Sequence, residues 1–309
     1  MRLRPRAAFA AALLSAALLA AAVATGALAP SPLAAWRAAG GGPPAPEGSG
    51  GADRAGPERD PGTARPGGAG SVEVVVHTPG FWSWAMLDRS TGVIVSGPGE
   101  PEATLSTESM IKVWIVADRL RTLSEAGIAV PEPELALARV AIRDSDDQAA
   151  ETLYRVGGGD AVIERLIRVC GLTGTTAYPA WWSRTEMSAT DAVRMGLCVA
   201  DGRAAGPDWT DWLLEEMRQV RGGTEAADQP HGGRWGIIDA LPADQAARLA
   251  IKNGWTPILA DGTWHVNCLA IADSWIMAVQ AQYPIELGLD HGAWVCAEVA
   301  GQLLGRPES

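Results

Sequence analysis

Strand-like segments lie at both ends of residues 72–309, and helical patterns fill the stretch between them. Strands are predicted at 72–76, 81–87 and 92–95, and again at 248–252, 264–271 and 275–281. Helices are predicted at 107–123, 134–142, 146–156, 160–169, 189–200, 210–220 and 289–304. The strands near the two ends must pair in one antiparallel sheet, which leaves the central helices as a separate lobe. We therefore expect an α+β fold, with an antiparallel sheet flanked by helices plus an all-helical lobe.

The first 29 residues have the pattern of a secretory signal peptide. Three arginines precede an Ala/Leu run at 7–24, and small residues at 22–24 and 27–29 offer cleavage sites. An uncleaved signal anchor is the alternative, because the run is long enough to span a bilayer. No cysteine lies near the run, which argues against a lipoprotein anchor.

Residues 30–71 are rich in Ala, Gly, Pro and Arg and show no structural period, so we expect a flexible tether. Residues 72–309 then form one domain, with a sheet lobe at about 72–125 and 232–309 and a helical lobe at about 126–231. We expect an extracytoplasmic or secreted monomer that contacts a membrane only if the signal segment is retained.

The charge of the chain excludes one class of partner. It has 36 acidic and 25 basic residues, which give a formal net charge of −11. Nucleic-acid binding requires a cationic surface, so we expect no nucleic-acid partner.

The four cysteines suggest two disulfides, because their number is even and the chain reads as exported. No C-x-x-C pair is present, which argues against a zinc ribbon or a thioredoxin-like motif. We favour the pairs Cys170–Cys198 and Cys268–Cys296, and buried free thiols remain an alternative.

The predicted helix at 107–123 carries two polar residues in an otherwise apolar stretch. A helix that is apolar on every side is a buried helix. Ser109 and Lys112 are three residues apart and therefore share a face. Burial lowers the pKa of a lysine toward that of a base, so the pair has what a nucleophile and its base need. A capping serine and a lysine that reaches solvent would be the structural alternative.

Two further segments complete a resemblance to a known family. Ser109-Met110-Ile111-Lys112 matches S-x-x-K, Ser145-Asp146-Asp147 is similar to S-D-N, and Lys252-Asn253-Gly254 is similar to K-T-G. The chain thus resembles the class A β-lactamases and D,D-peptidases, which are penicillin-recognising serine enzymes. The resemblance covers essentially all of residues 72–309.

The resemblance implies a role for each matching residue. Ser109 would be the nucleophile, Lys112 a base or proton relay, and Ser145 the group that passes a proton to the leaving nitrogen. Lys252 would tune Ser145 and attract a substrate carboxylate. The backbone N–H groups of Ser109 and Trp255 would form an oxyanion hole. The substrate-binding positions would be Asp147, Asn253, Gly254, Trp255 and Thr256.

The chain departs from the family pattern in two places. Asp147 stands where the family has an amide, and an ionised carboxylate can only accept hydrogen bonds, so it could pair with Lys112 or Lys252 instead. The E-x-x-L-N sequence that carries the deacylating glutamate of class A β-lactamases is absent. Glu186 is the only candidate for that role that lies in a loop, and we expect it to be a structural acid.

The histidines show no metal-binding pattern, and no cofactor or metal is expected. None of His77, His231, His265 and His291 has the i, i+4 spacing of a helical metal pair. We therefore treat all four as structural or surface residues.

The resemblance implies an exported serine hydrolase that acylates Ser109. Its substrate would be a β-lactam or a peptide-like amide or ester, such as a cell-wall peptide, and deacylation would be poor. A true class A β-lactamase that uses Glu186 is one alternative. A noncatalytic binding or sensor domain on the same fold is another.

Overall fold

The computed structural model describes residues 73–97, 103–225, 228 and 231–305, which all belong to one compact unit. The predicted signal peptide and tether lie outside these residues.

One antiparallel sheet joins the two ends of the domain, as the sequence predicted. Its strands are β1 (Phe81–Asp88), β2 (Ile94–Gly97), β6 (Ala250–Ile251), β7 (Gly254–Ile258), β8 (Thr263–Ile271) and β9 (Trp275–Pro284). Their order is β2-β1-β9-β8-β6, and β7 also pairs with β8. Strand β1 lies against β9, with Trp84 opposite Val279, so segments almost 200 residues apart are neighbours.

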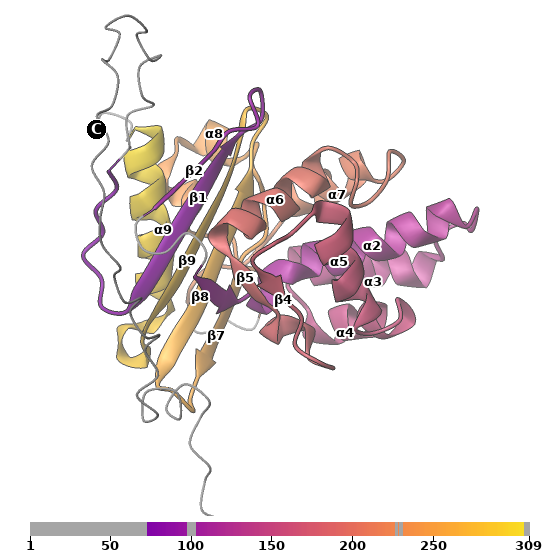
Figure 1. Cartoon of the computed structure of the whole chain (residues 1–309), viewed down its shortest axis with the longest axis horizontal. Helices are drawn as coiled ribbons and strands as arrows, with labels where there is room; N and C mark the ends of the chain where they lie inside the picture. Colours follow the sequence, from indigo (N-terminus) through magenta and orange to yellow (C-terminus); the bar gives the residue numbers. More distant parts are fainter. Residues whose placement is uncertain (1–72, 98–102, 226–227, 229–230, 306–309) are drawn as a thin grey trace, which may run out of the picture. The chain divides into compact units, whose positions relative to one another are not determined.

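Helices cover both faces of this sheet. Helix α9 (Gly288–Leu304) packs on one face, and α6 (Ala189–Ala200) packs on the other (Figure 1). Beyond α6 lie α2 (Lys112–Glu125), α3 (Glu132–Arg143), α4 (Asp147–Val156), α5 (Ala161–Cys170) and α7 (Thr210–Arg218). The short helix α8 (Ala243–Ala246) precedes β6, and four 3-10 turns are η1 (Glu108–Ile111), η2 (Trp182–Arg184), η3 (Ile237–Ala240) and η4 (Ile285–Leu287).

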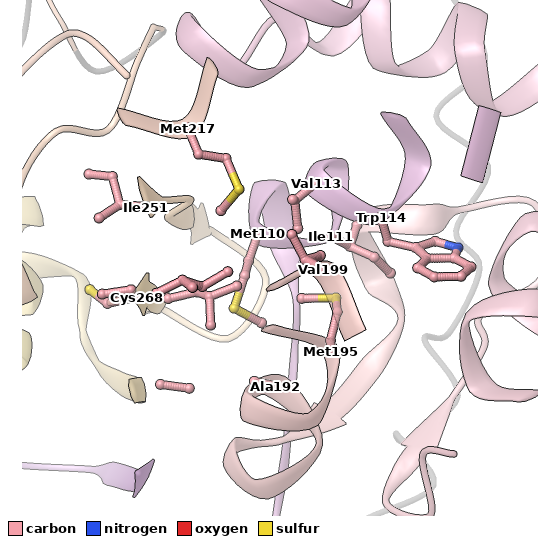
Figure 2. Close-up of a cluster of buried hydrophobic side chains, with 14 of the residues drawn as sticks. Met110, Ile111, Val113, Trp114, Ala192, Met195, Val199, Met217, Ile251 and Cys268 are labelled. Atoms are coloured by element: carbon pink, nitrogen blue, oxygen red, sulfur yellow. The ribbon is translucent and has the colours of Figure 1, made fainter. Parts of the chain in front are cut away.

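The predicted buried helix is α2, and it lies at the centre of the core. Its first turns are apolar on every side, and Val113, Trp114 and Ile115 are at most 1% exposed. Met195 of α6 and Met217 of α7 lie close to α2 and η1, and the side chain of Ile251 from the sheet lies nearby (Figure 2). The helical lobe and the sheet therefore share one continuous core.

Three features differ from the prediction. Residues 74–76 are not a strand, because Gln302 of α9 bonds both the N–H and the C=O of Val75 in place of a strand partner. Strand β7 was not predicted, because Gly254 and Pro257 weaken the strand pattern. A second sheet of β3 (Thr104–Ser106), β5 (Glu186–Ser188) and β4 (Thr175–Thr176) was also missed, because such short strands show little alternation.

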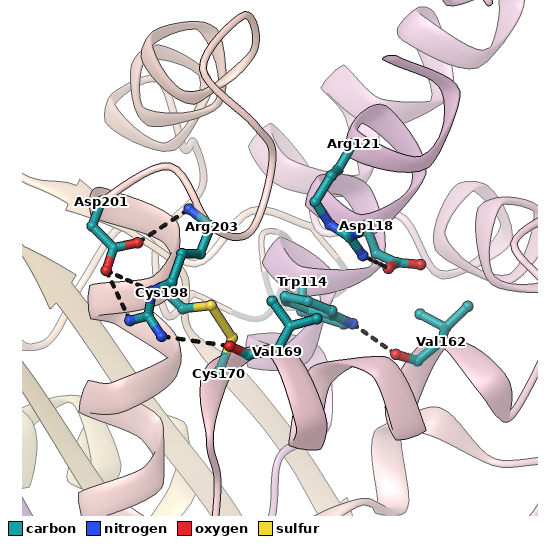
Figure 3. The surroundings of a disulfide bond; sticks show 9 residues. All are labelled: Trp114, Asp118, Arg121, Val162, Val169, Cys170, Cys198, Asp201 and Arg203. Atoms are coloured by element: carbon teal, nitrogen blue, oxygen red, sulfur yellow. Dashed lines mark hydrogen bonds and ion pairs between the residues drawn. A yellow bond between two sulfur atoms is a disulfide. The ribbon is translucent and has the colours of Figure 1, made fainter. Parts of the chain in front are cut away.

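Both favoured disulfides are present. Cys170–Cys198 joins α5 to α6, and Cys268–Cys296 joins β8 to α9. Beside the first disulfide, the indole of Trp114 donates to the carbonyl of Val162 and so ties α2 to α5 (Figure 3). Among the described residues, no helix is both long and apolar enough to cross a bilayer.

Candidate active site

Lys252 lies in a break between two strands. Strands β6 and β7 both pair with β8, and residues 252 and 253 interrupt them. The Lys252 side chain is fully buried, and its Nζ donates to Ser145 Oγ over 2.8 Å. The side chain of Lys252 thus extends from this break in the sheet to Ser145 at the start of α4.

Lys112 reaches the same serine from the first turn of α2. It is also fully buried, and its Nζ donates to the carbonyl oxygen of Ser145, to Ser145 Oγ over 3.3 Å and to Asp147 Oδ1 over 2.6 Å. Ser145 has a left-handed backbone with φ of 57°, immediately before the N-cap of α4. The structure therefore brings Lys112, Ser145 and Lys252 together, as their motifs suggested.

Burial dominates the electrostatics of both lysines. Desolvation lowers the pKa of Lys112, while Asp147 and Asp146 raise it in part. The pKa of Lys252 lies well below its ordinary value because of desolvation, and the charge of Lys112 lowers it further. Both lysines are thus shifted toward the neutral form, which can accept a proton.

Ser109 opens into a cleft of about 350 Å³ beside these lysines. Its position in η1 places it one turn before Lys112, although it is not among the three acceptors of Lys112 Nζ. The cleft is lined by Glu108, Ser109, Asp147, Gln148, Glu151, Ala180, Trp181, Trp182, Ser183, Trp255 and Thr256. As far as the structure describes it, the lining has three carboxylates and three indoles but no lysine, arginine or histidine.

Asp147 pairs with Lys112, one of the two lysines that its charge led us to expect as partners. Its side chain is 82% exposed at the mouth of the cleft and forms an ion pair with Lys112. An acceptor therefore stands where the family pattern has a donor.

Gly254 brings strand β7 directly against η1. A Cβ at this position would lie 2.5 Å from both the carbonyl oxygen of Thr107 and the backbone nitrogen of Met110. Only a glycine permits this approach, which places the β7 edge beside Ser109.

Relatives and solved structures agree with this architecture. No family model matches the chain. Proteins named "Putative lipoprotein LppW" from Mycobacterium tuberculosis and Mycobacterium bovis are 31% identical to it over 211 residues, which cover 66% of this chain. The matched part spans 64% of those relatives' length.

Several solved structures superpose on most of the chain. The TLA-3 extended-spectrum β-lactamase has a TM-score of 0.60 at 14% identity, over 74% of this chain and 93% of its own. A β-lactamase from Burkholderia vietnamiensis gives 0.57 at 16% identity, over 74% and 91%. The structure of PBP-A gives 0.56 at 15% identity, over 74% and 90%. The chain has the β-lactamase/transpeptidase-like fold.

Two of the residues expected to bind substrate already have hydrogen-bond partners within the protein. The Asn253 amide donates to the carbonyl oxygens of Gly233 and Trp235 over 2.8 and 2.7 Å, so it supports a neighbouring loop. The Thr256 hydroxyl donates to Glu108 over 2.7 Å. A carboxylate already takes this hydrogen bond, so an anionic substrate group would meet a like charge there.

Glu186 lies outside the described lining of the cleft. It belongs to β5, where its backbone pairs with Ser106 of β3, and its side chain is half-buried. Desolvation raises its pKa. Its role as a deacylating or a structural acid stays a prediction.

The aromatic loop divides into two parts. Trp182 is buried, its indole N–H donates to Glu151 over 2.8 Å, and its ring lies 5.4 Å from Lys112 Nζ. Tyr178 and Trp181 are more than half exposed and pack edge to face. The loop therefore has a buried part at Trp182 and an exposed part at Tyr178 and Trp181.

Glu108 is the site residue that sequence reasoning missed. It is 3% exposed and directly precedes Ser109, and desolvation raises its pKa. No motif marks it, and an acidic residue in the first turn of a helix is ordinarily a favourable charge near the helix N-terminus.

None of the four histidines belongs to the described lining of the cleft, although His265 Nδ1 lies 3.9 Å from Glu108 Oε1. His265 is buried against Ser106, and His291 contacts the Thr78 hydroxyl. Among the described residues, no group of His, Cys, Asp and Glu side chains could hold a metal ion.

Proposed function

We propose that the chain is an exported serine hydrolase that forms an acyl-enzyme on Ser109. The observation that carries this proposal is the buried chain of hydrogen bonds from Lys112 through Ser145 to Lys252, beside a cleft that exposes Ser109. Nothing in a purely structural role requires two desolvated lysines to share one serine hydroxyl, because burying each ammonium is costly.

The chemistry follows from the positions of these groups. Neutral Lys112 takes the hydroxyl proton of Ser109 as Oγ bonds to the carbonyl carbon of an amide, ester or β-lactam. The backbone N–H groups of Ser109 and Trp255 stabilise the oxyanion. Lys112 then returns a proton through Ser145 to the leaving atom as its bond to carbon breaks. Lys252 holds the Ser145 hydroxyl in place.

We further propose that the acyl-enzyme is hydrolysed slowly. The buried Trp182 ring covers Lys112, the Glu151 carboxylate accepts the Trp182 indole N–H, and Glu186 lies outside the described lining, so we expect neither glutamate to activate a hydrolytic water. Purified protein should hydrolyse nitrocefin weakly or not at all. Rapid turnover would favour the β-lactamase alternative, and in that case Glu186→Gln should trap an acyl-enzyme.

Intact-mass spectrometry tests the proposal. After exposure to a labelled penicillin or a fluorophosphonate, the wild type should gain the mass of one adduct. Ser109→Ala should gain none, and Ser183→Ala, which changes another serine of the same cleft, should still be labelled. The absence of a wild-type adduct, or an adduct that survives in Ser109→Ala, would contradict the catalytic proposal.

One observation favours a noncatalytic binding domain as a second candidate. Lys112 donates to Ser145 and Asp147 rather than to Ser109, and Asn253 and Thr256 are already engaged. A noncatalytic binding domain would bind a ligand saturably in the cleft, and the mass of the protein would not change.

Extracytoplasmic localisation is supported by two features. Disulfides persist in oxidising compartments, and this chain has two of them. The mycobacterial relatives are named as lipoproteins, which are exported proteins.

A further inference from the structure

Glu108 combines deep burial with an unusual backbone. It is 3% exposed, and its φ of 49° is left-handed, a conformation that is unfavourable for a non-glycine residue. A buried carboxyl group is also unfavourable unless hydrogen bonds satisfy it. Both costs fall on the residue directly before Ser109.

The hydrogen bonds of Glu108 join two separate elements. Its Oε2 accepts from Thr256 Oγ1 over 2.7 Å, and its Oε1 accepts from Ser106 Oγ over 2.6 Å. Glu108 adjoins Ser109 in η1, and Thr256 adjoins Trp255 in β7. The bond between Glu108 and Thr256 therefore links the neighbours of the two residues whose backbone amides would form the oxyanion hole.

Further contacts hold the backbone on both sides of Trp255. Gly254 lies directly on the backbone of η1, so Trp255 is held from both sides, at residue 254 by packing and at residue 256 by the hydrogen bond. Strand β8 also holds Ser106, which lies two residues before Glu108. Asn267 Nδ2 donates to the Ser106 carbonyl over 2.9 Å, and His265 Nδ1 contacts Ser106 Oγ over 2.7 Å.

We propose that Glu108 is a positioning residue that sets the separation between the backbone amides of Ser109 and Trp255. The inference rests on the proposed acylation of Ser109. Oxyanion donors act only when they are held at hydrogen-bond distance from the developing charge, so a small change in their separation slows the chemical step. Glu108 contributes to binding of the acyl donor much less than to this step.

Thr256→Val breaks the link and leaves the Glu108–Ser109 sequence intact. Stopped-flow acylation with a neutral p-nitrophenyl ester should show the limiting acylation rate constant fall about 10- to 100-fold, because one oriented donor is displaced. The binding constant for the ester should stay within about threefold, since only the chemical step depends on the link. Thr256→Ser keeps the hydroxyl and should restore the rate.

The matched control is Thr175→Val. Thr175 also donates its hydroxyl to a buried carboxylate, Asp191, over 2.8 Å, but it does so in the second sheet. Thr175→Val should acylate at the wild-type rate. Acylation of Thr256→Val at the wild-type rate, or an equal loss in Thr175→Val, would overturn the proposal.

A second measurement separates this inference from the proposed function. The backbone ¹H–¹⁵N signals of η1, which include that of Ser109 and lie far from residue 256 in the sequence, should shift in Thr256→Val and stay unchanged in Thr175→Val, whether or not the wild type is acylated. Unchanged signals would overturn the positioning role. Shifted signals in Thr256→Val, together with a wild type that is not acylated, would overturn the proposed function alone.

Discussion

At the scale of single residues, the centre of the proposed site is Ser145, whose hydroxyl lies between the buried amino groups of two lysines. Lys112 and Lys252 are both fully buried, and desolvation lowers the pKa of each. Two nearby carboxylates oppose this effect on Lys112, Asp147 at the mouth of the cleft with the larger effect and Asp146 with the smaller. The protonation of the proposed base therefore depends on an exposed carboxylate.

Replacing Asp147 with asparagine should move the pH dependence of acylation. Asp147 raises the pKa of Lys112, so Asp147→Asn should lower that pKa and move the midpoint at which acylation becomes fast to lower pH. Below the wild-type midpoint, the acylation rate at a given pH should rise about tenfold each time the pKa of Lys112 falls by one. Acylation rates across pH measure this, with the exposed Glu164→Gln as a charge-matched control. A midpoint that stays in place or moves upward would contradict the role of Asp147.

Glu108 should make the stability of the domain pH-dependent. Desolvation raises its pKa above the usual 4.5, so the folded chain holds this proton more tightly than the unfolded chain does. Its contribution to stability is fully present below the unfolded pKa and is lost as the pH rises through the folded pKa. Wild type should therefore lose stability relative to Glu108→Gln between about pH 4 and about pH 8. The loss should be about 1.4 kcal/mol for every tenfold difference between the folded and unfolded acid dissociation constants.

Urea unfolding of both proteins at the two pH values measures this difference. If the gap between wild type and Glu108→Gln stays constant with pH, Glu108 does not titrate in this range and the prediction is wrong.

At the scale of elements, the two disulfides offer a comparison inside one chain. Each joins cysteines 28 residues apart, so the chain-entropy model gives both the same stabilisation, about 3–4 kcal/mol. Their surroundings differ. Cys268–Cys296 lies under Gly236, where a Cβ would be 2.8 Å from Cys268 Sγ, and the preceding Trp235 holds the amide of Asn253.

Removing each disulfide should therefore separate stability from function. Replacing Cys170 and Cys198 with alanine, or Cys268 and Cys296, should lower the unfolding free energy by about 3–4 kcal/mol in either case. Only the second pair of substitutions should also slow acylation, because it loosens the loop behind β7. Denaturant unfolding and acylation rates on both variants check this, and equal acylation by the two variants would contradict it.

At the scale of the whole molecule, charge acts on the substrate before any contact forms. The chain has a formal net charge of −11, and the described lining of the cleft has Glu108, Asp147 and Glu151 with no basic residue. Both lysines of the site are fully buried. An anionic acyl donor therefore approaches against the field of the protein.

Salt should accordingly favour anionic acyl donors. Raising ionic strength from about 0.01 M to about 0.15 M shortens the screening length from about 30 to about 8 Å, so acylation by a penicillin carboxylate should accelerate severalfold. The methyl ester of the same penicillin should react at an unchanged rate. An anionic donor that slows as salt is added would show that the cleft attracts anions.

The sequence predicted the arrangement of helices and strands more completely than it predicted the contacts in the site. The helix patterns and the strands at both ends predicted the α+β fold, and the even number of cysteines in a chain that reads as exported suggested two disulfides. The helices and strands depend on local periodicity, which a sequence records directly. The motifs likewise selected Lys112, Ser145 and Lys252, whose side chains meet in the structure, and Ser109, which lines the cleft beside them.

Only the tertiary structure decided which partners the buried polar groups have. Asn253 bonds to a loop rather than facing the cleft, Thr256 bonds to Glu108, and Trp182 covers Lys112. Each of these contacts joins elements far apart in the chain. A buried polar group takes the partner that packing leaves within about 3 Å, and no local pattern carries that distance.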